Sequence, residues 1–246
     1  MTDNIHNLNI SEAFDGLDFT QLQKYLYSLD AEQRVKYILS RFSGPYALTS
    51  SFGAQSAVCL HLFTQQRKNI PVILIDTGYL FPETYQFIDQ LCDRLNLNLK
   101  VYKSKLSPAW LESRYGKLWA DGLQGVNKFN NIMKVAPLHQ ALDELGTKVW
   151  FSGIRSDQSQ SRKNKSIIEH KKYDSHAALL KVHPIIDWTD RDIYKYLKKH
   201  DLPYHPLWKK GYVSIGDMQT SHPLTAHMSA EDTRFFGLKR ECGIHD

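Results

Sequence analysis

With 246 residues, of which 42% are hydrophobic and 23% charged, the chain has the length and composition of a globular protein with one large α/β domain or two small ones. No apolar run approaches the ~20 residues of a membrane-spanning helix, and the first residues lack the basic start and apolar core of a signal peptide. We therefore expect a cytoplasmic protein with no membrane partner. The formal net charge of +5 indicates an anionic partner. Because the basic residues are spread along the chain, we expect a small phosphorylated ligand and no nucleic acid.

The predicted elements divide the chain into three parts. Residues 1–45 carry two helical patterns, end near the breaker Gly44-Pro45 and suggest a helical N-terminal segment. Residues 46–221 are interpreted as an α/β ligand-binding domain. Residues 222–246 are interpreted as a mobile C-terminal tail with a helix-like piece at 230–236.

The central part alternates apolar strands with amphipathic helices. Strands are expected at 46–50, 70–76, 98–102, 149–152 and 181–186, and helices at 57–66, 82–95, 107–119, 138–145 and 189–200. We interpret 119–131, with its two glycines, as a loop. The alternation predicts a doubly wound parallel sheet.

Three loops follow predicted strands, at 50–56, 76–79 and 153–162. Ligands of open α/β sheets bind at the carboxyl ends of the strands, so these loops share one rim. The first loop precedes a helix N-terminus, whose unpaired N–H groups favour an anion, although it lacks the Gly-Lys-Ser/Thr signature of a Walker loop. Arg155 and Arg162 are planar donors suited to phosphate or sulfate oxygens; a solvated basic loop is the other interpretation.

The three cysteines lie far apart in sequence, so a disulfide framework or a Cys-x-x-Cys metal site is not expected. Cys59 and Cys92 fall on apolar helical faces, where a small buried thiol is the ordinary case. Cys242 differs, because Lys239 and Arg240 precede it and His245 follows it. Nearby positive charge favours the thiolate, which is the nucleophilic form. The alternative is a polar tail with a cysteine of no function.

Four segments of the sequence together resemble the assimilatory phosphoadenosine phosphosulfate reductases. They are Ser50-Ser-Phe-Gly-Ala-Gln-Ser, Ile75-Asp-Thr-Gly-Tyr-Leu-Phe-Pro-Glu-Thr, Gly153-Ile-Arg-Ser-Asp-Gln-Ser-Gln-Ser-Arg and Lys239-Arg-Glu-Cys-Gly-Ile-His. The resemblance implies the adenine nucleotide α-hydrolase-like fold. It also implies reduction of 3′-phosphoadenylyl sulfate to sulfite and adenosine 3′,5′-bisphosphate, in the assimilation of sulfate for cysteine biosynthesis.

By this resemblance Cys242 is the nucleophile that forms a Cys-S-sulfonate, with His245 near the leaving group. Thioredoxin or glutaredoxin then supplies electrons and releases sulfite. The residues expected to bind the substrate are Ser50, Ser51, Phe52, Gly53, Asp76, Thr77, Gly78, Lys134, Gly153, Arg155, Arg162, Arg234, Lys239 and Arg240. The basic residues among them would neutralise the polyanion so that a thiolate can approach it.

The resemblance also suggests a homodimer without a bound cofactor. The related adenylyl sulfate reductases hold a four-iron cluster on paired cysteines just before the position of Lys134, where this chain has Asn130-Asn-Ile-Met133. We therefore expect no iron–sulfur cluster and a preference for the 3′-phosphorylated substrate. Ser156 stands where the family is expected to carry a basic residue.

Two other functions remain open from the sequence. The first is an ATP pyrophosphatase or adenylyltransferase of the same fold, which the missing Ser-Gly-Gly-x-Asp-Ser loop disfavours. The second is a nucleotide- or RNA-binding module without catalysis, for which the positive net charge is the only argument.

Overall fold

The computed structural model describes residues 8–9, 18–171, 179–239 and 241–244, with only the backbone of 8 and 9. Its strands are β1 (Leu8–Asn9), β2 (Phe42–Ser43), β3 (Tyr46–Thr49), β4 (Pro71–Ile75), β5 (Asn98–Tyr102), β6 (Val149–Ser152), β7 (Ile168–Lys171) and β8 (Leu179–Val182). Its α-helices are α2 (Phe19–Tyr27), α3 (Ala31–Arg41), α4 (Ala57–Gln66), α5 (Pro82–Leu95), α6 (Pro108–Tyr115), α7 (Gly122–Asn130), α8 (Ala136–Glu144) and α9 (Asp190–Lys199).

The main sheet has six strands in the order β5-β4-β3-β6-β8-β7. All neighbouring pairs are parallel except β7 and β8, which pair antiparallel at the edge. The chain runs from β3 outward through β4 and β5, and then returns to place β6 on the other side of β3. The order therefore reverses between β3 and β6, and a crevice for a ligand is expected at this reversal. The predicted parallel sheet is confirmed, with the addition of one antiparallel edge strand.

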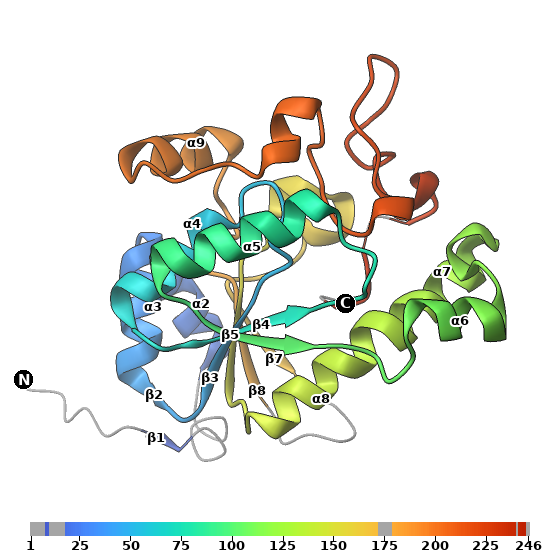
Figure 1. Ribbon diagram of the computed structural model, residues 1–246. Helices are drawn as coiled ribbons and strands as arrows, with labels where there is room; N and C mark the ends of the chain where they lie inside the picture. The colour runs from blue at the N-terminus through green and yellow to red at the C-terminus, as the bar shows by residue number, and fades with distance from the viewer. Residues whose placement is uncertain (1–7, 10–17, 172–178, 240, 245–246) are drawn as a thin grey trace, which may run out of the picture.

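Helices cover both faces of the sheet (Figure 1). Successive residues of a strand point to opposite faces. Leu48 and Phe151 accordingly pack into the large core beneath α2, α3, α4, α5 and α9. Their neighbours Ala47 and Trp150 pack into a smaller core with Leu138 of α8. This burial on both faces explains why the central strands β3, β4 and β6 are largely apolar.

Several helices begin where the sequence places a start signal. Asp30 caps α3 and Thr189 caps α9, each in a capping box that satisfies otherwise unpaired N–H groups. Pro82 occupies the first turn of α5, where its missing N–H costs nothing. Helices α2 and α3 contribute to the same core as the sheet. Within the described ranges, no helix combines the length and apolarity that crossing a membrane requires.

The interpretation of 119–131 as a loop is wrong. Residues 122–130 form α7, and a π-helical turn, Asn131–Val135, joins it to α8. Gly125 is not a helix breaker here, because it allows close packing. A Cβ at this position would lie 2.2 Å from the carbonyl oxygen of Leu118.

The helix-like piece expected at 230–236 is also wrong. The structure has turns there and one short 3₁₀ segment, Phe235–Gly237. Phe235 and Phe236 have φ angles of 47° and 57°, which an α-helix cannot accommodate. The tail instead forms a loop whose base is closed by an antiparallel bridge between Ser221 and Arg234. After this bridge, residues 241–244 lie at the carboxyl ends of the strands (Figure 1).

Candidate active site

A cavity of about 470 Å³ lies at the carboxyl ends of the central strands, where the strand order reverses. The loops after β3, β4 and β6 line it together with the start of α8, the segment 213–217 and the C-terminal tail. This one cavity is lined by ten of the residues that the sequence predicts to take part in binding or catalysis: Ser50, Ser51, Gly53, Thr77, Lys134, Gly153, Arg155, Arg162, Arg234 and Cys242.

The loop after β3 presents hydroxyl groups to the cavity. Ser50 Oγ accepts a hydrogen bond from the backbone N–H of Phe52 at 3.1 Å, which holds the turn. Phe52 itself has a φ of 49° and a fully buried ring in the large core, so only its backbone is close to the site. Ser56 precedes α4, and its buried Oγ lines the cavity without a hydrogen-bond partner in the described structure. A buried hydroxyl of this kind is satisfied by a ligand or by water.

A buried ion pair forms the wall after β4. Lys134 Nζ lies 2.5 Å from Asp217 Oδ2, with side chains 7% and 0% exposed. Thr77 donates its hydroxyl to Asp217 Oδ1 at 2.5 Å. Burial alone would raise the pKa of Asp217, but the charge and hydrogen bond of Lys134 and the bond from Thr77 outweigh it and lower the pKa. Asp217 is therefore ionised at neutral pH and holds Lys134 at the cavity wall.

Asp76 shapes this loop and does not line the cavity. Its Oδ1 accepts from the backbone N–H of Gly78 at 2.8 Å and from Tyr85 Oη at 2.7 Å. Gly78 has a φ of 73°, and a Cβ there would lie 2.7 Å from Pro108. These contacts fix the turn that points Thr77 at Asp217.

Arg155 is buried at one side of the cavity, and its guanidinium is hydrogen-bonded to neighbouring residues. Its Nη2 donates to Asp190 Oδ1 at 2.6 Å and to Gln55 Oε1 at 3.0 Å, and its Nη1 donates to the Trp188 carbonyl at 3.1 Å. These bonds join the loop after β3 to the start of α9. Ser156 hydrogen-bonds the Ile186 carbonyl through both its backbone N–H and its hydroxyl.

Arg234 carries a positive charge into the cavity from the tail. It is 8% exposed, and the described residues place no carboxylate in an ion pair with it. Its Nη1 makes a long bond of 3.4 Å to Ser214 Oγ. Burial lowers its pKa, and the nearby acidic groups of Cys242, Asp217 and Glu241 partly offset this effect. Arginine nevertheless stays charged at neutral pH, so Arg234 is a buried cation suited to an anionic ligand.

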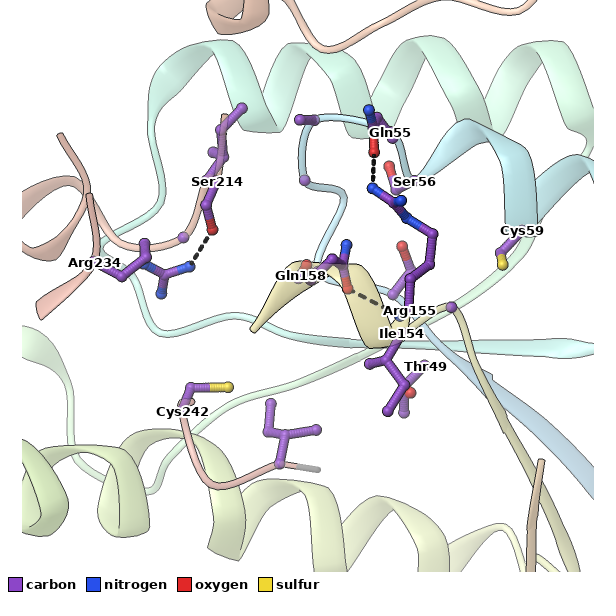
Figure 2. Close-up of a pocket in the computed structure, with 18 of the residues that line it drawn as sticks. Thr49, Gln55, Ser56, Cys59, Ile154, Arg155, Gln158, Ser214, Arg234 and Cys242 are labelled. Carbon is purple, nitrogen blue, oxygen red and sulfur yellow. Dashed lines mark hydrogen bonds between the residues drawn. The ribbon is translucent and has the colours of Figure 1, made fainter. Parts of the chain in front are cut away.

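Cys242 is half-buried and lines the same cavity. Figure 2 shows its side chain reaching inward from the tail on the same side as Arg234, with Gln55 and Arg155 across the cavity. Cys59 also lines the cavity, but its buried surroundings raise the pKa of its thiol to about 12. Cys92 is half-buried on α5, outside the cavity, and burial raises the pKa of its thiol as well. Cys242 is therefore the thiol placed for chemistry.

Not every expected residue reaches the cavity. Phe52, Asp76 and Gly78 act as described above, and Lys239 lies near the surface with its Nζ 3.2 Å from Asn127 Oδ1. Arg240 and His245 lie outside the described residues. Among the described side chains, no group of three or more His, Cys, Asp or Glu residues gathers as metal ligands would.

The carboxylates of the site were not predicted from the sequence. Asp217, Asp190 and Glu241 each pair with one of the expected cations. Each is distant in sequence from its partner, so no local pattern could reveal the pairing. Burial would raise the pKa of Glu241, but the bonds and charge of Arg162 and the serines around it lower it. Glu241 directly precedes Cys242 and was visible in the tail motif.

Comparison with known proteins identifies the family. The phosphoadenosine phosphosulfate reductase domain matches residues 45–223. A phosphoadenosine 5′-phosphosulfate reductase of Xanthomonas euvesicatoria pv. vesicatoria is 55% identical over 236 residues, which cover 96% of this chain and 95% of the relative. One from Cronobacter sakazakii is 55% identical over 221 residues, which cover 90% of this chain and 88% of the relative.

Solved structures agree on the fold. The phosphate complex of a phosphoadenylyl-sulfate reductase from Candida auris superposes with a TM-score of 0.69 at 26% identity, covering 82% of this chain and 95% of that one. A Candida glabrata FMN adenylyltransferase shares the fold alone, at 15% identity and a TM-score of 0.58, covering 85% of this chain and 76% of that one. The adenine nucleotide α-hydrolase-like fold expected from the sequence is confirmed. The chain belongs to the phosphoadenosine phosphosulfate reductase family.

Proposed function

We propose that this protein reduces 3′-phosphoadenylyl sulfate to sulfite and adenosine 3′,5′-bisphosphate, through a covalent intermediate on Cys242. The observation that carries the proposal is that the Cys242 thiol and the Arg234 guanidinium line the same cavity, together with the loop after β3. An adenylyltransferase of the same fold has no need of a thiol at that place. The family and the 50–55% identity of relatives named for this reaction support the proposal.

The first step is a displacement at sulfur. The Cys242 thiolate attacks the sulfur of the sulfate group, an S–S bond forms, and the bond from sulfur to the bridging oxygen breaks. That oxygen keeps the electron pair, and adenosine 3′,5′-bisphosphate leaves. Thiolate and substrate are both anions, so the attack needs cations beside the sulfate and the leaving phosphate. Arg234 and Lys134 line the same cavity as Cys242, and Arg234, which has no carboxylate partner among the described residues, suits this role best.

The second step returns the thiol. A thiolate of thioredoxin or glutaredoxin attacks the Cys242 sulfur, and sulfite leaves with the electron pair of the S–S bond. The second thiol of the donor then breaks the mixed disulfide and regenerates Cys242. The two electrons that reduce the sulfate sulfur to sulfite therefore come from the oxidised dithiol. We expect this reaction to serve sulfate assimilation and cysteine biosynthesis in the cytoplasm, and we expect a homodimer.

No resident cofactor is needed for these steps. Residues 130–133 are Asn, Asn, Ile and Met, which offer no thiolate for an iron–sulfur cluster at the position used by the related adenylyl sulfate reductases. Lys134 follows them in the π-helical turn, and such turns often occur at functional sites. We expect the 3′-phosphorylated nucleotide to be the preferred substrate.

The proposal is tested by product analysis. Purified protein, thioredoxin and a thioredoxin-reducing system are mixed with 3′-phosphoadenylyl sulfate, with adenylyl sulfate or with ATP. The expected result is sulfite release with the first nucleotide, much slower release with the second, and no pyrophosphate from ATP. Pyrophosphate release without sulfite would identify an adenylyl-transferring enzyme instead.

Replacing Gly216 with alanine tests the role of Arg234 without removing it. A Cβ at Gly216 would lie 2.4 Å from Arg234 Nη2 and 2.7 Å from its Cζ, so the guanidinium must move. We expect sulfite release to slow on the order of 10- to 100-fold, as displacement of a positioning group by about 1 Å does in other enzymes. Gly116→Ala is the control, because Gly116 lies outside the cavity lining and a Cβ there meets no atom within 4 Å. Equal rates for the two variants would contradict the role of Arg234.

A further inference from the structure

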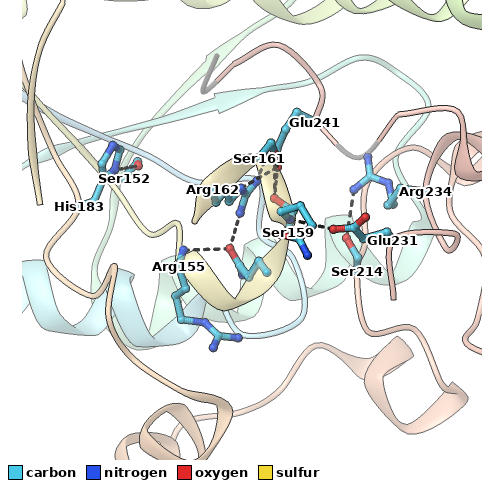
Figure 3. A network of polar contacts seen from close by, with 12 residues as sticks. Ser152, Arg155, Ser159, Ser161, Arg162, His183, Ser214, Glu231, Arg234 and Glu241 are labelled. Atoms are coloured by element: carbon cyan, nitrogen blue, oxygen red, sulfur yellow. Dashed lines mark hydrogen bonds and ion pairs between the residues drawn. The ribbon is translucent and has the colours of Figure 1, made fainter. Parts of the chain in front are cut away.

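A buried carboxylate directly precedes the nucleophile. Glu241 is 7% exposed, and both of its oxygens face the guanidinium of Arg162 on the loop after β6. Arg162 Nε donates to Oε1 at 2.8 Å and Nη2 donates to Oε2 at 2.7 Å. The hydroxyls of Ser159 and Ser161 add bonds to Oε1 at 2.8 and 3.2 Å (Figure 3). Four donors from one loop therefore hold this side chain of the tail.

Arg162 has little capacity left for a ligand. Its Nε and Nη2 bind Glu241, and its Nη1 donates to Gln158 Oε1. Gln158 in turn accepts from the backbone N–H of Arg155 at 3.1 Å, which ties the arrangement to the wall of the cavity. A phosphate or sulfate group could take the paired edge of Arg162 only by displacing Glu241. The geometry therefore assigns Arg162 to the tail in this state of the protein.

The ion pair also removes an electrostatic obstacle. A free carboxylate beside Cys242 would repel a polyanionic substrate and disfavour the thiolate. Paired with Arg162, Glu241 adds almost no net charge to the cavity. A glutamine could keep some of the hydrogen bonds, but it would leave the buried guanidinium without its counter-charge.

The neighbouring contacts of the tail are of another kind. Lys239 donates to Asn127 Oδ1 at 3.2 Å near the surface, and the half-buried Ile244 packs against the core beneath α8. Glu241 lies between them in the sequence, provides a buried polar contact and directly precedes Cys242. Its backbone is continuous with Cys242, so fixing the carboxylate restricts where the sulfur can lie.

We propose that Glu241 is a positioning residue, whose paired contact with Arg162 and the two serines holds the Cys242 thiol in the cavity for attack on sulfur. The proposal rests on the proposed function only for the identity of the reaction. Its effect belongs to the formation of the covalent intermediate and not to the affinity for the nucleotide.

The first test measures the rate of S-sulfonate formation and the affinity for the nucleotide separately in Glu241→Gln. Formation of the Cys242-S-sulfonate is followed in a single turnover without thioredoxin, and the Kd of adenosine 3′,5′-bisphosphate is measured by calorimetry. We expect the rate to fall at least about 10-fold and the Kd to change less than about threefold, because misplacement of a reacting group costs rate and not ground-state binding. A variant with the rate of the unaltered protein, or one whose Kd worsens as much as its rate, overturns the proposal.

The second test does not depend on the sulfonucleotide. Alkylation of Cys242 by iodoacetamide is followed by peptide mass in ligand-free protein. We expect severalfold faster alkylation in Glu241→Gln, because the tail opens. An unchanged alkylation rate would contradict the proposal that Glu241 holds the tail in place. If the unaltered protein forms no S-sulfonate, the proposed function fails, while this measurement still decides whether Glu241 holds the tail.

Glu231→Gln is the matched control. Its Oε1 accepts from the backbone N–H of Gln160 at 2.9 Å, so it also joins the tail to the loop after β6, but it is not part of the Arg162 pair. We expect the control to keep the sulfonation rate and the alkylation rate of the unaltered protein. If Glu241→Gln fails to fold in a thermal unfolding measurement, Arg162→Lys replaces it. Lysine keeps the charge without spanning both oxygens, and we expect the same slower sulfonation with little change in Kd.

Discussion

Replacing Cys242 with serine is expected to abolish sulfite release while leaving the nucleotide bound. A serine hydroxyl is not ionised at neutral pH, so it cannot replace the thiolate as the nucleophile. We expect turnover to fall by more than about 10³-fold, which is the scale of losing a covalent nucleophile. Affinity for adenosine 3′,5′-bisphosphate should change little, because the loops after β3, β4 and β6 remain. Sulfite assays and calorimetry measure the two effects.

Cys59→Ala serves as the control for this variant. Cys59 lines the same cavity, but its thiol has a raised pKa of about 12 and is almost entirely protonated at neutral pH. We expect Cys59→Ala to retain S-sulfonate formation on Cys242. If Cys59→Ala lost the S-sulfonate intermediate and Cys242→Ser kept it, Cys59 would be the nucleophile, which would contradict the role of Cys242.

Replacing Lys134 with methionine is expected to give the largest loss of stability. The change keeps an unbranched side chain but leaves the fully buried Asp217 without its cation. Breaking a buried ion pair from one side typically costs about 3–5 kcal/mol in the free energy of unfolding. We also expect sulfite release to fall, because Lys134 lines the cavity. Urea unfolding followed by circular dichroism measures the first effect.

Two further variants separate charge from packing. Lys134→Met with Asp217→Asn removes both charges and keeps an acceptor for Thr77, so we expect most of the lost stability to return while activity does not. Lys210→Met breaks an ion pair with Glu83 in which the lysine side chain is 64% exposed. We expect this variant to lose less than about 1 kcal/mol in the free energy of unfolding. Equal losses in Lys134→Met and Lys210→Met would contradict the account of the buried pair.

The stability of the buried pair should also depend on pH in a defined direction. Because the folded protein lowers the pKa of Asp217, the stabilisation is present above the ordinary carboxyl pKa of about 3.9 and is lost as the pH falls through the lowered value. In Lys134→Met the main cause of the lowering is gone and burial favours the neutral acid. The difference in unfolding free energy between the two proteins should therefore narrow as the pH falls from the raised pKa of Asp217 in the variant, above about 3.9, to its lowered pKa in the unaltered protein.

Much of the fold could be predicted because its signals are local. The bounds of α4, α5 and β5 match the predicted ranges, since apolar periodicity and Pro82 act over a few residues. The edge strand β7 was missed because its Ile-Glu-His-Lys sequence carries little apolar signal. Gly125 was misread because the close approach of Leu118 that requires a glycine is a tertiary contact.

The candidate site shows the same division. The cations and Cys242 were predicted because a positive charge or a thiol can be recognised from the residue type alone. Their partners were not, since the bonds from Thr77 to Asp217 and from Ser159 to Glu241 join residues 140 and 82 positions apart. The sequence suggested that Arg162, Arg155 and Lys134 are free charges, but in the structure each is a member of an ion pair.

The central claim is that Cys242 accepts the sulfonate, and intact-protein mass tests it most directly. Reduced protein is mixed with 3′-phosphoadenylyl sulfate without thioredoxin, and the modified peptide is then mapped. We expect a stable gain of one sulfonate on Cys242, which disappears when reduced thioredoxin is added. An unmodified Cys242 under conditions in which thioredoxin still produces sulfite would contradict the account, because the sulfate would then be reduced without the covalent step.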